Sequence, residues 1–256
     1  MTGNWNRPFL SIVVPAHNEE LRLPRCLTLI EAFLKRQPYQ AEVVIVENGS
    51  HDRTLEIARE FATTRRWIRP MQVDGRGKGQ AVRAGMLAAR GDYRFMCDVD
   101  LSMPIEEIVH FLPPNVRGYD LAIASRQGEG ARRVGEPLHR YIMGRVHSTI
   151  VRLIAVRGFA DTQCGFKMFS RQAAEDLFRV QQIQGIGFDV ELLMIAGSRG
   201  YKIKQVPITW HYDSDSRIQL VKDSLGMLRD TWSVRRNLRS GVYAPIEAPA
   251  PTRRAA

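Results

Sequence analysis

Apolar runs and helical stripes alternate along the first half of the chain. Between the runs, apolar residues recur every three or four positions, as in residues 21–36, which is the spacing of an amphipathic helix. This order of strand, helix and strand predicts an α/β fold with a mostly parallel sheet covered on both faces. In such a sheet, ligands bind at the edge formed by the carboxyl ends of the strands. The runs expected to form strands are residues 9–14, 41–46, 67–73, 93–97 and 120–124.

The second half continues with helices and one further strand. Residues 127–136 are rich in glycine and charge, which predicts a mobile loop that can act as a lid over the binding edge. A long helix is expected at 138–156, and further helices are expected up to residue 180 and from residue 187. The strand expected at 202–210 contains Pro207, and proline favours the edge of a sheet.

Composition restricts the class of protein. With 256 residues, 44% of them hydrophobic and 25% charged, the chain has the composition of an ordinary globular domain. Cys26, Cys97 and Cys164 are odd in number and far apart, so neither disulfides nor a zinc site are expected, and a reducing cytoplasm fits best. No signal peptide and no membrane span are expected from the apolar runs.

The net charge of +10 indicates acidic partners, which are nucleic acid, anionic lipid or phosphorylated small molecules. The sequence contains no recognisable nucleic-acid-binding module, so no nucleic acid is predicted among the partners.

Two carboxylates follow the fourth apolar run. Asp98 and Asp100 are separated by one residue, and in a strand residues two apart face the same side. Both can then reach one hard cation at the carboxyl end of a strand, where a metal-bridged diphosphate is the natural guest. The alternative is an Asp-rich turn that caps a helix starting near Pro104, and the local pattern leaves both open.

A glycine-rich segment precedes the helix expected at 80–89. Its glycines let backbone amides approach a ligand, and Lys78 adds a positive charge at the amino end of that helix, which is an anion-binding environment. A plain flexible turn is the other interpretation of the same residues.

Five short blocks follow one another along the chain, at residues 13–20, 47–54, 77–79, 98–100 and 161–167. In this order they resemble the family-2 inverting glycosyltransferases, whose fold is the GT-A fold of nucleotide-diphospho-sugar transferases. The resemblance covers residues 9–220 and is strongest to the dolichyl- or polyprenyl-phosphate glucosyltransferases and their mannosyl cousins. It implies one catalytic domain over residues 1–242, with a nucleotide-sugar half at about 9–125 and an acceptor half at about 126–240.

The resemblance implies roles for residues of the nucleotide-sugar half. Asp98 and Asp100 would bind Mg²⁺ or Mn²⁺ across the donor diphosphate, with Ser102 near the metal. Glu47 stands where the family usually has Asp, and a longer side chain can still accept a hydrogen bond from base or ribose. The full set expected to bind the nucleotide sugar is Pro15, Ala16, Glu19, Glu47, Lys78 and Asp98.

The acceptor half carries the remaining implied roles. Asp161 is the candidate general base if the acceptor is a hydroxyl, or else it orients a basic residue; both roles stay open. Arg126 and Lys167 resemble basic residues placed near phosphates and complete the predicted catalytic set. The residues expected at the acceptor and its phosphate are Arg140, Asp189, Ser216 and Arg217.

The implied activity is transfer of a hexose from UDP-glucose or GDP-mannose, with glucose favoured, to a polyprenyl or dolichyl phosphate. The alternatives are a family-2 enzyme with a soluble or glycan hydroxyl acceptor and a nucleotide-diphosphate-binding protein without transferase activity.

The last helix bears on the lipid acceptor. From residue 218 its apolar positions fall on one face and are flanked by Lys and Arg, as in helices that lie on anionic membranes, although such a face can equally pack on the catalytic core. A cytoplasmic protein in peripheral contact with the inner face of the plasma membrane is expected. Residues 243–256 are expected to form a disordered tail. The apolar positions are Ile218, Val221, Leu225, Leu228 and Trp232.

Overall fold

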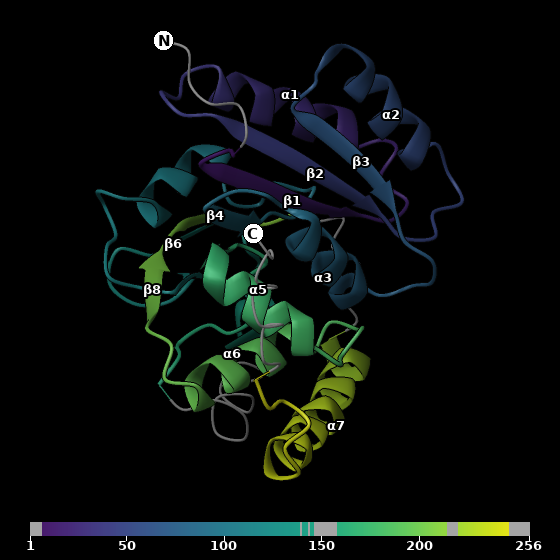
Figure 1. Cartoon of the computed structure of the whole chain (residues 1–256). Coiled ribbons are helices and arrows are strands. Elements are labelled where there is room, and N and C mark those ends of the chain that lie inside the picture. Colours follow the sequence, from purple (N-terminus) through teal and green to yellow (C-terminus); the bar gives the residue numbers. More distant parts are fainter. Residues whose placement is uncertain (1–6, 139, 143, 146–157, 214–219, 246–256) are drawn as a thin grey trace, which may run out of the picture.

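The computed structural model describes residues 7–138, 140–142, 144–145, 158–213 and 220–245. Its centre is a seven-stranded sheet of order β3-β2-β1-β4-β7-β5-β8 (Figure 1). All neighbouring strands pair in parallel except β7, which is antiparallel to both β4 and β5. The strands are β1 (Leu10–Ala16), β2 (Ala41–Glu47), β3 (Ile68–Gln72), β4 (Tyr93–Met96), β5 (Leu121–Ser125), β7 (Lys167–Ser170) and β8 (Ile203–Pro207).

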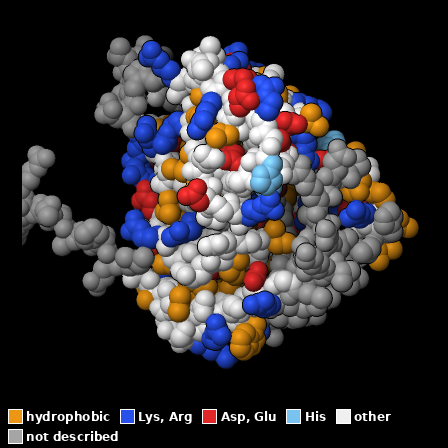
Figure 2. Space-filling model, turned by 90° about the vertical axis from the view of Figure 1, so that its right-hand side faces the viewer, with side chains coloured by type: hydrophobic (Ala, Val, Ile, Leu, Met, Phe, Trp, Pro, Cys, Tyr) orange, Lys and Arg blue, Asp and Glu red, His pale blue; other side chains and the backbone are white. Residues whose placement is uncertain are grey.

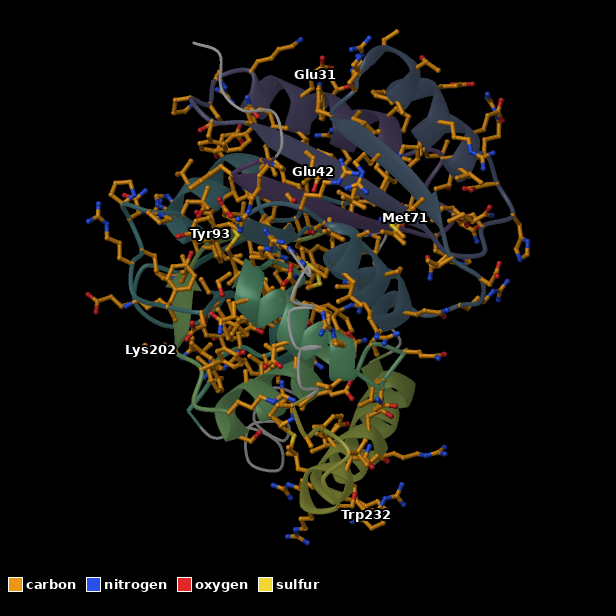
Figure 3. All side chains as sticks on the ribbon, in the orientation of Figure 1. Glu31, Glu42, Met71, Tyr93, Lys202 and Trp232 are labelled. Atoms are coloured by element: carbon orange, nitrogen blue, oxygen red, sulfur yellow. The ribbon has the colours of Figure 1, made fainter. Side chains whose placement is uncertain are left out.

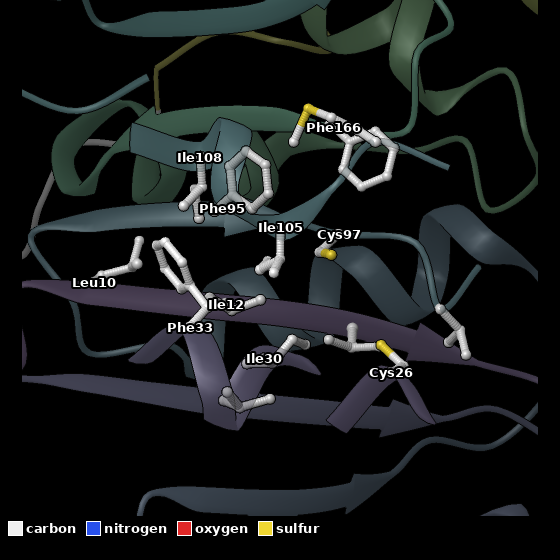
Figure 4. Close-up of a cluster of buried hydrophobic side chains, with 14 of the residues drawn as sticks. Leu10, Ile12, Cys26, Ile30, Phe33, Phe95, Cys97, Ile105, Ile108 and Phe166 are labelled. Atoms are coloured by element: carbon white, nitrogen blue, oxygen red, sulfur yellow. The ribbon is translucent and has the colours of Figure 1, made fainter. Parts of the chain in front are cut away.

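Helices cover both faces of the sheet, as predicted. One hydrophobic core lies between the sheet and α1, α2 and the 3₁₀ helix η1, and Figure 4 shows part of it around Phe33, Phe95 and Ile108. The other core lies beneath α3, α5, α6 and the end of α7. The helices are α1 (Leu23–Leu34), α2 (Thr54–Thr64), α3 (Lys78–Ala88), η1 (Ile105–Phe111), α5 (Arg171–Val180), α6 (Phe188–Ser198) and α7 (Leu220–Arg239).

The five strands predicted in the first half are confirmed, whereas the prediction of a continuous loop at 127–136 is wrong. Residues Arg132–Val134 form β6, which pairs in parallel with β9 (Thr209–His211) in a separate two-stranded sheet. The strand predicted at 202–210 is therefore divided. Its first part is β8, which lies at the edge of the main sheet as Pro207 indicates, and its second part is β9.

Two predicted segments lie partly outside the described residues. The helix expected at 138–156 is helical at its described positions from Leu138 to Arg145. The disordered tail predicted to begin at residue 243 was placed too early, because Tyr243 is 4% exposed and its hydroxyl donates to Glu191 Oε1 at 2.7 Å. No helix in the described ranges is both long and apolar enough to cross a membrane.

The last helix packs on the core through Thr231 and Val234, and Trp232 faces away from it. Thr231 and Val234 are buried, whereas Trp232 is 64% exposed and points away from the sheet (Figure 3). The interpretation in which Trp232 packs on the core is therefore wrong. Ile218 lies outside the described residues, as do the side chains of Val221, Leu225 and Leu228.

Candidate active site

Asp98 and Asp100 lie beyond the strand in a turn, so the strand geometry predicted for them is wrong; the alternative of an Asp-rich turn fits, although η1 has no side-chain cap. β4 ends at Met96, and the turn is closed by the Leu101 amide, which donates to Asp98 O at 3.3 Å. Leu101 has φ 48°, a conformation that tightens the turn. The two carboxylates still lie at the carboxyl edge of the sheet, because β4 runs parallel to β1 and ends beside it.

Asp98 is held between a cation and a glycine. Its Oδ1 is 2.6 Å from Lys78 Nζ, at the first residue of α3. A Cβ atom at Gly165 would lie 1.8 Å from Asp98 Oδ2, so only glycine allows the loop before β7 to pass this carboxylate.

Substituting this glycine should therefore disable the site. In Gly165→Ala the methyl group must displace the carboxylate of Asp98, and we expect the activity of the site to fall by at least about tenfold, as for a misplaced functional group. Gly197→Ala is the matched control, because nothing lies within 4 Å of a Cβ at that position in α6. Equal activity of the two variants would contradict this packing.

The charge balance around Asp98 and Asp100 suits a cation. Burial and the neighbouring charge of Asp98 raise the pKa of Asp100, whose Oδ1 accepts from the Ser102 amide at 2.9 Å. Burial lowers the pKa of Lys78, but Asp98 and Asp189 outweigh that effect and raise it. Lys78 thus neutralises part of an acidic cluster in which Asp100 has no ion pair among the described residues.

These carboxylates fit a divalent metal only together with further ligands. No group of three or more His, Cys, Asp or Glu side chains that could hold a metal occurs in the described part of the chain. Mg²⁺ is usually bound by one or two carboxylates plus substrate phosphates and water, and Asp98 and Asp100 supply two. These two carboxylates therefore fit a metal ion that binds together with a diphosphate ligand.

Asp161 and Arg126 form a buried, two-pronged ion pair. Arg126 Nε is 2.7 Å from Asp161 Oδ2, a terminal nitrogen donates to Oδ1 at 3.0 Å, and the Arg126 amide donates to Oδ2 at 3.1 Å. Burial raises the pKa of Asp161, but Arg126 outweighs it and sets the pKa at about 2. Arg126 keeps 24% of its side chain exposed while that of Asp161 is 1% exposed, so Arg126 is the more accessible partner.

Lys167 and Asp189 form a second pair that is almost fully enclosed. Lys167 Nζ is 2.7 Å from Asp189 Oδ1 and donates to Cys164 O at 2.6 Å. Burial raises the pKa of Asp189 in spite of Lys167. The two side chains are 1% and 7% exposed, so the predicted direct contacts of Lys167 and Asp189 with phosphate do not fit this arrangement. They instead join β7 to the first turn of α6.

The first two blocks lie at the ends of β1 and β2, beside this edge. Pro15 and Ala16 end β1, whereas Glu19 is engaged by Arg22, at 2.7 Å to each carboxylate oxygen. Glu47 is 1% exposed and its Oε1 accepts from the Ser50 amide. Its Oε2 is buried without a hydrogen-bond partner among the described residues, which suits a carboxylate that awaits a donor.

No contact among the described residues joins the other predicted acceptor residues to the Arg126–Asp161 or Lys167–Asp189 ion pair. Arg140 is half-buried in the helical stretch that starts at Leu138, and Ser216 and Arg217 lie outside the described residues. The structure adds Trp210 on β9, whose ring centroid is 5.5 Å from Arg126 Cζ. No local spacing marks Trp210, because residues 126 and 210 are far apart in the sequence and meet through the pairing of β5 with β8 and of β6 with β9.

Charged side chains lie on the face of the molecule at this edge. Figure 2 views the molecule from the side on which β1 and β2 end in Figure 1, and basic and acidic side chains lie close together on it. Such a surface, with paired cations beside a cluster of carboxylates, suits phosphorylated ligands.

Comparison with solved structures defines the class of fold. A glucosyl-3-phosphoglycerate synthase from Mycobacterium tuberculosis, in complex with Mn²⁺, UDP and phosphoglyceric acid, matches with a TM-score of 0.61 and 22% identity, over 94% of this chain and 80% of that one. A mannosyl-3-phosphoglycerate synthase from Rubrobacter xylanophilus matches with a TM-score of 0.64 and 18% identity, over 95% and 78%. The chain thus has the GT-A-like fold of nucleotide-sugar transferases.

Sequence comparison then gives the family. The model of glycosyl transferase family 2 matches residues 11–178, and the chain belongs to that family. A dolichyl-phosphate beta-glucosyltransferase of Trichomonas vaginalis is 33% identical over 92% of this chain and 73% of its own length. The dolichyl-phosphate beta-glucosyltransferase of Homo sapiens is 30% identical over 93% and 79%.

Proposed function

We propose that this chain transfers glucose from UDP-glucose to a polyprenyl or dolichyl phosphate with inversion at the anomeric carbon. The names of its relatives support the reaction, and the ligands of a structural neighbour support a uridine nucleotide.

The observation that carries the proposal is the state of Asp161. Both its oxygens are occupied by Arg126 and its pKa is about 2, so it is a poor proton acceptor at neutral pH. A hydroxyl acceptor needs a base, whereas a lipid monophosphate is already anionic. The arrangement therefore favours the phosphate acceptor, with Asp161 as a positioning residue that holds Arg126 toward it.

On the donor side, this chain contributes charge and orientation. Lys78 supports the diphosphate from the amino end of α3, and the free oxygen of Glu47 accepts a hydrogen bond from base or ribose. Asp98 and Asp100 would hold Mg²⁺ or Mn²⁺, which supplies positive charge to the departing nucleoside diphosphate. Arg126 then holds the acceptor phosphate so that its oxygen meets the anomeric carbon from the face opposite the leaving group.

Acceptor chemistry tests this proposal. With UDP-glucose as donor, a short-chain polyprenyl phosphate should be glucosylated and the matching polyprenol should not, because Asp161, the candidate base, is bound to Arg126 and holds its proton too weakly. Efficient glucosylation of the polyprenol or of a sugar hydroxyl would instead support the alternative of a hydroxyl acceptor.

A lipid acceptor requires access to a membrane, and we place the contact at the end of α7. Trp232, Arg235, Arg236 and Arg239 line a hollow of 400 Å³ together with Ser240. Arg236 Cζ lies 5.4 Å from the Trp232 ring centroid. An exposed Trp among arginines is suited to the headgroup region of anionic lipid, and we expect peripheral contact with the inner face of the plasma membrane.

Reversing charge in this patch should release the protein from anionic vesicles. In Arg235→Glu/Arg236→Glu we expect binding to phosphatidylglycerol-containing vesicles to fall by at least about tenfold, since each arginine near such a surface contributes about 1 kcal/mol. Arg59→Glu/Arg66→Glu, at exposed positions in and after α2, changes the net charge equally and serves as the control. Co-sedimentation measures binding, and the same loss in both double variants would contradict a contact through α7.

A further inference from the structure

The two-stranded sheet lies beside the Arg126–Asp161 pair and has no role in the function proposed above. β6 and β9 are aligned so that Arg133 is the direct neighbour of Trp210. The sheet is fixed at both ends, because the Arg132 amide donates to Ile208 O at 2.9 Å and the Tyr212 amide donates to Val134 O at 2.9 Å. Its register therefore determines where the Trp210 ring lies.

Arg126 is fixed from three directions. Asp161 binds the edge of its guanidinium, and the Trp210 ring lies 5.5 Å from Cζ. Arg133 Nε donates to the Arg126 carbonyl at 3.1 Å. Trp210 and Arg133, which supply two of these three contacts, are paired neighbours in the small sheet. Together the three contacts leave the guanidinium little freedom to rotate.

Arg133 extends the same stack and is itself neutralised. Its Cζ lies 5.8 Å from the Trp210 ring centroid and 5.5 Å from that of Tyr141. Its terminal nitrogen is 2.7 Å from Glu136, with both side chains largely buried. Arg133 therefore serves to hold Trp210 in place, while Arg126 remains the partly exposed cation of the stack.

The same strand reaches the donor side. The His211 amide donates to Ser102 O at 2.7 Å, two residues after Asp100. β9 is thus bonded to the turn that carries the carboxylates and packs against the arginine assigned to the acceptor. A change that affects Trp210 alone should leave that backbone bond intact and act on the acceptor side only.

We propose that Trp210 is a positioning residue that fixes the Arg126 guanidinium for the acceptor phosphate and thereby determines affinity for the monophosphate acceptor. This inference rests on the proposed function. The ring supports Arg126 through a cation–π contact, whose strength depends on an aromatic face and not on apolar bulk alone.

Three variants separate this role from simple packing. Trp210→Leu keeps apolar bulk without an aromatic face, and Trp210→Phe keeps a face. Phe61→Leu is the matched control, because it removes a similar stack, with Arg65 Cζ 4.9 Å from the ring, on α2. Steady-state kinetics with UDP-glucose and a short-chain polyprenyl phosphate give KM for each substrate, and thermal unfolding reports folding.

In Trp210→Leu we expect KM for the polyprenyl phosphate to rise about tenfold, the scale of a partly desolvated cation–π contact, with KM for UDP-glucose unchanged. Trp210→Phe should restore most of the acceptor affinity. A similar acceptor KM in Trp210→Leu and Phe61→Leu, or a rise in both substrate KM values that Phe does not correct, would overturn the role of Trp210. A wild-type protein that transfers nothing would contradict the proposed function itself.

Discussion

Asp161→Asn should lower kcat/KM for transfer by about 10²–10³-fold, the scale on which enzymes lose activity when one oriented charge-stabilising group is removed. The amide keeps the shape of the carboxylate but cannot accept both guanidinium hydrogen bonds or neutralise Arg126. A buried guanidinium without its counter-charge will either shift or draw in water. We expect the loss in kcat/KM for the polyprenyl phosphate, whereas the affinity for UDP, measured by calorimetric titration, should not change.

The same variant carries a pH signature. Because the folded-state pKa of Asp161 lies below its ordinary value of 3.8, at about 2, the pair stabilises the protein above the ordinary value and loses that contribution as pH falls toward 2. The shift corresponds to about 2 kcal/mol at neutral pH. The difference in unfolding free energy between wild type and Asp161→Asn should therefore shrink steadily below about pH 4. A difference that stays constant across this range would show that the ion pair is not its source.

Asp100→Asn should abolish most metal-supported transfer and yet stabilise the metal-free protein. Activity is expected to fall by at least about 10²-fold, because an amide is a weaker ligand for a hard cation. Without metal, the substitution removes a negative charge that Asp98 repels, and this repulsion contributes to the raised pKa of Asp100. The melting temperature should thus rise in the variant in EDTA.

Thermal unfolding with Mn²⁺ and UDP, compared with EDTA, measures both effects. Wild type should gain stability from the ligands and Asp100→Asn should not. Asp92→Asn is the control, because Asp92 precedes the other end of β4 and forms an exposed ion pair with Arg7. Stabilisation of Asp100→Asn by Mn²⁺ and UDP to the same extent as wild type would exclude Asp100 as a metal ligand.

The main sheet could be predicted from the sequence because its strands are short apolar runs separated by regular helices. The place of β7 could not, because an antiparallel strand between β4 and β5 depends on partners far away in the sequence. The position of β7 between β4 and β5 also explains why Lys167 is buried. Strand alternation places Lys167 on the side of Phe169, which faces the core beneath α5 and α6, while its pairing with Met96 keeps it at the carboxyl end of β4.

In the candidate site too, contacts between residues far apart in the sequence could not be predicted. Asp98 and Asp100 were predictable as a pair at the edge, but strand alternation was the wrong reason, because β4 ends before them. The pairing of Asp161 with Arg126 was one of two open roles, since residues 35 positions apart meet only through the fold. Trp210 carried no local signal at all, because its place depends on the register of β6 with β9.

The most direct test of the account is transfer of radiolabelled sugar to a short-chain polyprenyl phosphate, with UDP-glucose and GDP-mannose as parallel donors and with Mg²⁺, Mn²⁺ or EDTA. The account predicts labelled glycolipid from UDP-glucose, dependent on the metal and with the β configuration. No labelled lipid from UDP-glucose, while UDP still binds the purified protein, would contradict it.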